Sequence, residues 1–244
     1  MMPTRSSPLN ASRRQAPQPL CRPALARTLA LAPLLGLLLA GCSLLPKSAP
    51  VDLYQLPSAL PLQAPSASST AQRPESLRVT RPTAGTLLAG QRIIVLPEGD
   101  RVSYYKGAQW SEPAPLLLRN RLLDALRHDG RLTTLSSDDR MLQADFELDG
   151  ELRAFQSVYQ GGSPQVLLQL DLRLVQPATQ RIVASRRFEQ RQPAADSALP
   201  AVVSAFGQAS DRLALQVVDW SVEQIAQTPR PDDRPATATA VEQK

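Results

Sequence analysis

Few side chains in this sequence could carry out catalysis. His128 is the only histidine among 244 residues, so any catalytic arrangement that needs an imidazole would depend on it. It follows a leucine-rich segment that we predict to be helical, where a histidine more commonly interacts with the helix end or with solvent. We therefore predict no catalytic residue and no enzymatic activity.

Acidic side chains alternate along one short segment, at Asp145, Glu147, Asp149 and Glu151. Calcium sites usually gather their ligands around a turn, whereas alternate strand positions spread carboxylates apart. The spacing therefore favours the solvated face of a strand over a metal site. The sequence also lacks the glycine spacing of a phosphate-binding loop, and we predict no metal and no cofactor.

The thiol of Cys42 follows the most apolar run of the chain. Residues 1–41 contain five arginines and no acid, and the mainly apolar stretch from Thr28 to Ala40 has 13 residues. A basic segment, a short apolar segment and then small residues are typical of a secretory signal peptide. The stretch is shorter than the roughly 20 residues that cross a bilayer. An uncleaved anchor or a buried helix is the alternative interpretation.

The tetrapeptide Leu39-Ala40-Gly41-Cys42 resembles the lipobox of bacterial lipoproteins, in which the cysteine becomes the first residue and carries lipid. Several acyl chains give a stable membrane anchor, whereas a single chain binds reversibly. Ser43 stands where an aspartate would be the inner-membrane retention signal, so the resemblance implies the outer membrane, facing the periplasm. Cys21 would be removed with the leader, which leaves Cys42 no partner for a disulfide.

The net charge depends on the leader. The whole chain carries a formal charge of +5, but removing the five leader arginines leaves 22 Lys and Arg against 22 Asp and Glu. Aromatic residues make up only 4% of the chain. A neutral, aromatic-poor remainder gives no indication of a nucleic-acid partner.

Composition divides the chain into five regions: a signal peptide (1–41), a lipid anchor with a first strand (42–56), a linker rich in Pro, Ala and Ser (57–75), a globular domain (76–227) and a disordered tail (228–244). A domain near 150 residues buries about 70% of its unfolded surface, which supports a core without disulfides. We therefore expect one globular domain.

Periodicity within the domain predicts both helices and strands. Residues 77–80, 92–96, 101–105 and 181–191 are strand-like, and alternation is clearest in 144–154 and 166–174, which are joined by the hairpin sequence QGGSP. Ser111 could cap a helix that ends at Gly130, and a long apolar stripe predicts a second helix from about Asp196 to Gln227. The expected fold is α/β, a single layered domain whose mixed, mostly antiparallel sheet is packed by two amphipathic helices.

Charge pairing suggests a register for the central hairpin. If Tyr159 faces Gln165, then Arg153 faces Asp171 and opposite charges meet across the strands. This register places three apolar side chains on an otherwise polar face: Phe155, Tyr159 and Leu167. Such a patch can mark a partner or lipid contact. The alternative is that a bulge turns the aromatic residues inward or that another element covers them.

The order of the motifs becomes recognisable at residues 104–113 (YYKGAQWSEP), where Trp-x-Glu-Pro opens a leucine-rich helix. In this order of motifs the chain resembles the ABC-type transport auxiliary lipoproteins (PqiC-like). The other motifs that carry the resemblance are the lipobox, DLYQLP, LRNRLLDALRHDGRL, FELDGELRAFQ and a final helix containing Trp220. It departs from them at TLLAGQR, where members often have Tyr-Leu-x-Arg-Pro.

The resemblance implies a non-enzymatic outer-membrane lipoprotein that accompanies an ATPase, a permease and a substrate-binding protein with an MCE (mammalian cell entry) domain. Such systems move phospholipid or other amphiphiles between two membranes. A homo-oligomer is compatible with this role. The alternative function is a structural or envelope-assembly lipoprotein that binds an outer-membrane protein or peptidoglycan.

Overall fold

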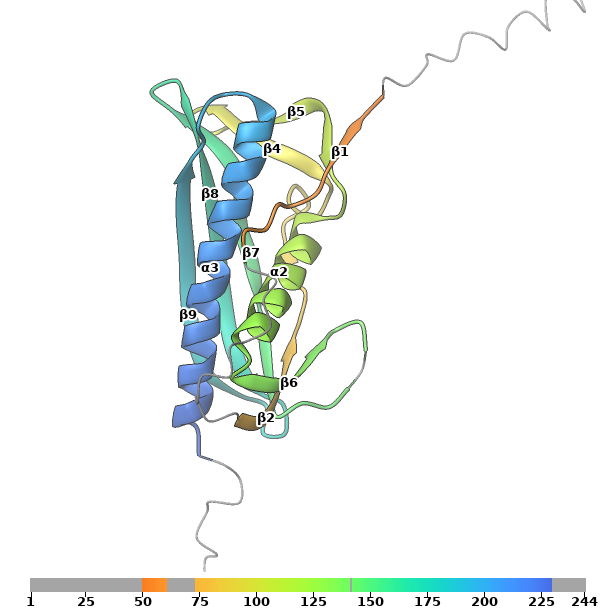
Figure 1. Ribbon diagram of the computed structural model, residues 1–244, viewed down its shortest axis with the longest axis vertical. Helices are drawn as coiled ribbons and strands as arrows, with labels where there is room; N and C mark the ends of the chain where they lie inside the picture. Colours follow the sequence, from red (N-terminus) through yellow and green to blue (C-terminus); the bar gives the residue numbers. More distant parts are fainter. Residues whose placement is uncertain (1–49, 61–72, 141, 230–244) are drawn as a thin grey trace, which may run out of the picture. The chain divides into compact units, whose positions relative to one another are not determined.

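The computed structural model describes residues 50–60, 73–140 and 142–229 (Figure 1). Along the chain these residues form β1 (Asp52–Tyr54), β2 (Arg73–Val79), β3 (Thr83–Ala84), β4 (Arg92–Glu98), β5 (Arg101–Trp110), α2 (Ala114–Asp129), β6 (Leu132–Ser137), β7 (Phe146–Gln160), β8 (Ser163–Gln176), β9 (Arg181–Pro193) and α3 (Leu199–Gln227). Neither helix of this part of the chain has the length and apolar character needed to cross a membrane. The predicted signal peptide and Cys42 lie outside the described residues.

The strands form one mixed sheet around β7. Its order is β1-β5-β4-β7-β2-β6, and β8 pairs with β7 and β9. Strand β7 pairs along one edge with β8 and along the other edge with β2, β3 and β4 in succession. The longest strands pair antiparallel, in the β7–β8 and β8–β9 ladders. The predicted layered α/β fold with a mixed sheet is therefore confirmed.

Two strands were missed in the sequence pattern, and a third was predicted from it. The short strands β3 and β6 were not predicted, because neither TA nor LTTLSS alternates between apolar and polar residues. The predicted first strand does form, and β1 pairs parallel with β5, with Leu53 opposite Gln109. Residues 52–54 are therefore part of the sheet.

The β7–β8 hairpin has a different register from the predicted one. Its turn uses Gly161 and Gly162 with φ of 60° and 86°, the left-handed values that a two-residue hairpin turn requires. Tyr159 pairs with Pro164 instead of Gln165. Because the turn is one residue shorter than predicted, each β7 residue from Tyr159 back to Ala154 pairs one position earlier on β8 than predicted.

A bulge at Arg153 shifts the register a second time. Leu152 pairs with Leu170, whereas Ala154 pairs with Gln169, so one residue of β7 is inserted between them. Arg153 still lies 3.6 Å from Asp171, but as a diagonal neighbour. The predicted charge attraction is present, and the register inferred from it is wrong.

Helices α2 and α3 cover one face of the sheet (Figure 1). The N-cap of α2 is Pro113 and no side chain caps it, so the predicted cap by Ser111 does not form. Instead the Ser111 backbone N–H donates to the Tyr54 carbonyl at 2.8 Å and holds β1. Helix α2 ends at Gly130 in the left-handed conformation, φ 74°, as the sequence predicts.

The core lies between the two helices and the sheet. Along β8 the inward side chains are all buried: Val166, Leu168, Leu170, Leu172 and Leu174. The predicted apolar stripe of α3 meets them and is buried as well at Val202, Val203, Phe206, Ala209, Leu213, Val217 and Trp220. Of the helices in the described residues, neither lies on the opposite, outer face of the sheet (Figure 1).

Candidate interaction sites

Phe155 is part of the core and not of a surface patch. Its side chain is 1% exposed. Its ring centroid lies 4.9 Å from that of Phe206 and 5.7 Å from that of Trp110. The bulge at Arg153 reverses the alternation of β7 and turns Phe155 toward the helices. For Phe155 the predicted exposure is wrong, and the bulge is the physical reason.

Tyr159 and Leu167 remain partly exposed, but on opposite faces of the sheet. Tyr159 pairs with Pro164 on the helix-facing side, whereas Leu167 pairs with Gln156 on the outer face. The three residues therefore do not form one patch. Contact of Tyr159 or Leu167 with a partner or lipid stays a prediction.

The residues after β1 contact both helices. We call Leu56–Leu60 the strap. Leu56 and Leu60 pack against the core. Residues 57–60 and 73–75 were predicted as parts of the linker over 57–75, but the first belong to the strap and the second to β2. Residues 61–72 lie outside the described part of the chain.

A buried ion pair holds the strap. Arg121 on α2 and Asp211 on α3 form this pair, with side chains 6% and 10% exposed. The Arg121 guanidinium also donates to the carbonyl oxygens of Leu56 at 3.0 Å and Pro57 at 2.6 Å. The Asp211 carboxylate accepts the Ala59 N–H at 2.8 Å. Both buried charges thus make further hydrogen bonds to the strap backbone, and such bonds help a buried pair to offset its desolvation.

The strap lies against the backbone of α3 at Gly207. A Cβ placed on Gly207 would lie 2.6 Å from the Pro57 carbonyl oxygen and 3.1 Å from the Pro57 Cβ. Such a distance is well inside van der Waals contact, so only glycine lets the strap approach the helix this closely. Helix α3 therefore supplies both the acceptor and the space for the strap.

Neither Arg121 nor Asp211 was predicted as a site residue from the sequence. In the sequence Arg121 is off the four-residue spacing of Leu118, Leu122 and Leu126, which indicates a solvent-facing position, yet it is 5% exposed. For its partner, Asp211, the sequence does indicate burial. Asp211 is the only acid between Leu199 and Val218, within the apolar part of α3. A lone acid in an apolar helix face indicates a buried partner of opposite charge.

The outer face of the sheet has two unlike halves. On β7, β8 and β9 it carries ion pairs, and we call this the ion-paired half. The Arg187 guanidinium donates two hydrogen bonds to Asp171, at 2.6 and 2.7 Å. Glu189 accepts from Gln169 at 2.7 Å and from Arg191 at 2.8 Å.

The other half, on β1, β5, β4 and the loop before β4, carries exposed apolar side chains. We call it the apolar half and define it by Val51, Leu53, Leu87, Val102 and Tyr104. These are five of the eight large apolar residues that are exposed in the described part of the chain. In Figure 1, β1, β4 and β5 lie together at the upper end of the domain.

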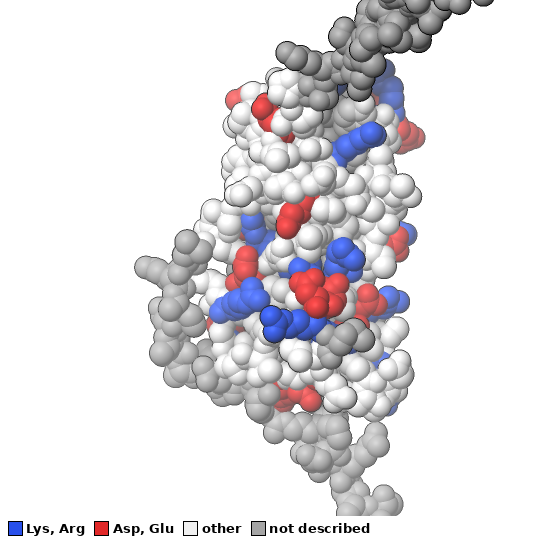
Figure 2. Space-filling view, turned by 90° about the vertical axis from the view of Figure 1, so that its right-hand side faces the viewer, with Lys and Arg blue, Asp and Glu red and all other residues white. Residues whose placement is uncertain are grey.

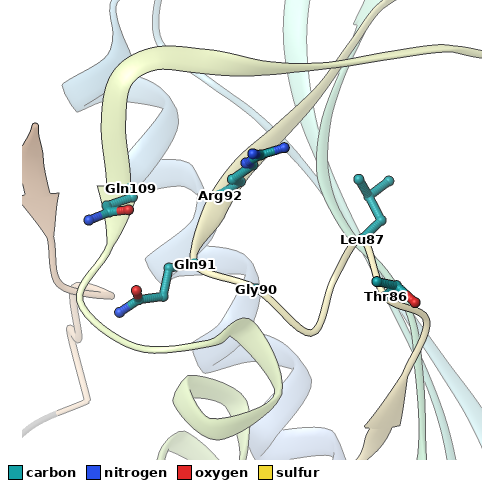
Figure 3. Close-up of a pocket in the computed structure, with 6 residues that line it drawn as sticks. All are labelled: Thr86, Leu87, Gly90, Gln91, Arg92 and Gln109. Carbon is teal, nitrogen blue, oxygen red and sulfur yellow. The ribbon is translucent and has the colours of Figure 1, made fainter. Parts of the chain in front are cut away.

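An open depression of about 590 Å³ borders the apolar half. Its lining comes from the loop before β4, the start of β4 and β5: Thr86, Leu87, Gly90, Gln91, Arg92 and Gln109 (Figure 3). The Gln91 side-chain amide donates to the Ser111 carbonyl at 2.8 Å, and the Arg92 guanidinium stacks over the Tyr104 ring at 4.7 Å. Both polar groups are thus already engaged within the protein.

Charges on the side of the domain shown in Figure 2 are mixed in sign. Blue and red side chains lie next to each other over its middle, and most of the surface above them is uncharged. Arg119, for example, pairs with two acids, Asp138 at 2.5 Å and Asp139 at 2.8 Å, so its charge is balanced within the domain. A basic stripe of the kind that binds nucleic acid is not visible on this side.

The titratable groups of the described residues offer little for catalysis. Burial raises the pKa of Tyr105 to about 12, so its phenol is neutral at physiological pH. No three His, Cys, Asp or Glu side chains gather to hold a metal ion within residues 50–60, 73–140 and 142–229. His128 is partly exposed near the end of α2, which is where the sequence placed it.

Comparison with known families identifies the chain. The sequence model of the ABC-type transport auxiliary lipoprotein component matches residues 54–218, which is more than half of the chain. The chain belongs to this family. The match begins in β1 and includes the strap, Arg121, Asp211 and most of α3. The resemblance inferred from the motifs is therefore confirmed, and with it the assignment to a lipoprotein component of ABC-type transport.

A curated relative and two solved structures are similar to this chain. An uncharacterized protein of Bradyrhizobium diazoefficiens is 30% identical over 148 residues, and the aligned part covers 60% of this chain but only 39% of that protein. A crystal structure of a Xanthomonas campestris protein has a TM-score of 0.65 at 26% identity and covers 72% of this chain and 98% of its own. Another crystal structure of an uncharacterized protein has a TM-score of 0.55 at 17% identity, covering 71% and 99%.

Proposed function

We propose that this protein is the non-enzymatic auxiliary lipoprotein of an MCE-type lipid transport system and works at the periplasmic face of the outer membrane. The family match over residues 54–218 carries the proposal. Lipidation at Cys42, inferred from the lipobox, attaches the chain to the membrane. An MCE-domain substrate-binding protein, a permease and an ATPase are the partners, and phospholipid or another amphiphile is the cargo.

The position of β1 supports a short tether. Because β1 pairs with β5, only residues 43–51 separate Cys42 from the sheet. Nine residues span at most about 30 Å when fully extended. The domain therefore works next to the bilayer that holds its lipid, which suits a component that docks the outer end of a transport machine.

The chemistry of the domain supports docking over catalysis. Its single histidine is partly exposed, and its buried ion pair is hydrogen-bonded to the strap backbone. The exposed features are an apolar area and a face of paired charges, both of which are suited to contacts with other molecules.

Cross-linking in intact cells tests the proposal. The full-length protein is cross-linked, recovered from outer-membrane fractions and analysed by mass spectrometry, with Cys42→Ser as the unlipidated control. We expect recovery of an MCE-domain protein with the wild type and loss of outer-membrane fractionation with Cys42→Ser. Recovery of outer-membrane assembly proteins or peptidoglycan without any MCE-domain protein would reject transport and favour the envelope-assembly alternative.

A further inference from the structure

Four side chains of the apolar half, Leu53, Leu87, Val102 and Tyr104, lie around two polar residues of the outer face, Gln109 and Arg92. Leu53 pairs with Gln109 across β1 and β5, and Gln109 pairs with Arg92 across β5 and β4. Arg92 in turn stacks over Tyr104. Val102 lies two residues before Tyr104 on the same face of β5, and Leu87 borders the depression that Arg92 and Gln109 line.

This surface faces away from the core. Tyr54 and Trp110 pair with each other on the core side, and Trp110 is fully buried. The side chains at the preceding positions, Leu53 and Gln109, therefore point to the outer face. Leu53 is 65% exposed, which is the largest value among the exposed apolar residues of the described chain.

The chain from the lipid enters the domain on this surface. Residues 43–50 alone separate Cys42 from Val51, and Val51 and Leu53 belong to the apolar half. Eight residues cover at most about 28 Å, so the bilayer that receives the lipid is within reach of this surface. A tether this short raises the effective concentration of the bilayer at the domain, and weak apolar contacts then suffice for docking.

The residues around the surface fit a bilayer interface. Tyr104 is partly exposed beside the Arg92 guanidinium, and Lys106 follows on β5. Tyrosine is favoured at the level of lipid head groups, and long basic side chains reach from apolar surface into water. Acidic residues also lie at the edge, at Asp52, Glu98 and Asp100. The balanced charge favours contact through apolar and aromatic side chains over attraction to anionic lipid.

We propose that the apolar half docks onto the surface of the bilayer that anchors Cys42, so that the domain lies on the membrane in one orientation. The inference rests on the lipid anchor of the proposed function. It adds a second, reversible membrane contact and a fixed orientation.

Site-specific fluorescence tests the docking. With Cys42 lipidated and Cys21 removed with the signal peptide, the mature chain has no free thiol, so one new cysteine can be labelled. Val102→Cys places an environment-sensitive dye on the apolar half, and Ile182→Cys is the matched control on the exposed outer face of β9. The lipidated full-length protein is reconstituted into phosphatidylcholine vesicles with and without nitroxide-bearing lipid.

We expect blue-shifted emission and several-fold stronger nitroxide quenching at Val102→Cys than at Ile182→Cys. Replacing Leu53 with Glu should abolish that difference while the protein still floats with the vesicles. Equal quenching at the two positions, with the protein floating, overturns the docking and leaves the anchor intact. A blue shift without lipid quenching means that protein covers the surface, which also overturns it. Failure to float overturns the anchor and, with it, this inference.

Discussion

Two arginine–aspartate pairs in this domain have the same chemistry and different surroundings. Arg121 and Asp211 meet between the helices, almost completely buried, and also bind the strap backbone. Asp171 and Arg187 meet on the outer face of the sheet, with side chains 34% and 58% exposed. The buried pair holds α2, α3 and the strap together. The exposed pair joins β8 and β9, which are already paired by backbone hydrogen bonds.

Burial determines what the loss of either pair costs. A charge left alone in the interior keeps its desolvation penalty without its partner, so breaking a buried pair is strongly destabilising. A charge left alone at the surface is solvated by water, so an exposed pair contributes little to the free energy of unfolding. Substitutions at the two sites should therefore differ in how much stability they remove, in how that loss depends on salt, and in which segment of the chain loses its contacts.

The largest effect is expected for Asp211→Leu. This substitution leaves the Arg121 guanidinium buried without a counter-charge and removes the acceptor of the Ala59 N–H. We expect a loss of about 3 to 5 kcal/mol in the free energy of unfolding. Urea denaturation of the mature chain measures it.

The double variant Arg121→Leu/Asp211→Leu is the control for that effect. Because no charge remains buried, it should lose less than the sum of the two single variants, which a double-mutant cycle detects. A loss below about 1 kcal/mol in Asp211→Leu would show that the pair behaves like a surface one.

A smaller effect is expected for Gly207→Ala. Its Cβ would overlap the Pro57 carbonyl oxygen, so the strap must move away from α3 at a cost of about 1 to 3 kcal/mol. The amide of Ala59 should then exchange its hydrogen faster. Gly85→Ala is the matched control, because a Cβ added at Gly85 would meet no atom beyond its chain neighbours within 4 Å. If Gly207→Ala were more stable than the wild type, by the roughly 1 kcal/mol of better helix propensity, the contact would not be tight.

The smallest effect is expected for Asp171→Asn on the ion-paired half. We expect a loss of about 0.2 to 1 kcal/mol that shrinks as salt is added, because exposed charges are screened. Parallel denaturation at low and high salt of Asp171→Asn and Asp211→Leu measures the contrast. A salt-independent loss in Asp171→Asn would contradict the distinction between the two sites.

The pH dependence of the exposed pair has a definite sign. The hydrogen bonds from Arg187 hold the pKa of Asp171 below its usual value. A carboxylate with a lowered pKa stabilises the fold above the ordinary aspartate pKa, near 3.9, and loses this contribution as the pH falls through the lowered value. The stability difference between wild type and Asp171→Asn should therefore be constant near neutral pH and shrink below about pH 4.

Much of the fold follows from local pattern. The apolar stripe from Val202 to Trp220 predicted α3, and Gly130 correctly ended α2. Failures arose where tertiary contacts override local signals. Ser111 has the chemistry of a helix cap but uses its backbone to hold β1, and β6 lacks alternation although it pairs with β2. The inserted residue at Arg153 cannot be seen in a pattern of period two.

The interaction sites were harder to predict for the same reason. Arg121 and Asp211 lie 90 residues apart, and only the packing of α2 on α3 makes them neighbours. The apolar half likewise combines residues from β1, β5 and the loop before β4, none of which forms an apolar run by itself. Phe155 was misassigned because one bulge exchanged the two faces of β7.

The docking of β1 and the strap has a mechanical consequence. A pull on the lipid-bearing end reaches the hydrogen bonds between β1 and β5 first and the contacts of the strap with Arg121 and Asp211 only afterwards. A force along β1 loads its ladder bonds together, which resists separation better than opening them one at a time. If the partners of the domain move relative to the membrane, tension would thus be borne in two stages, and the sheet could release β1 while the helices still held the strap.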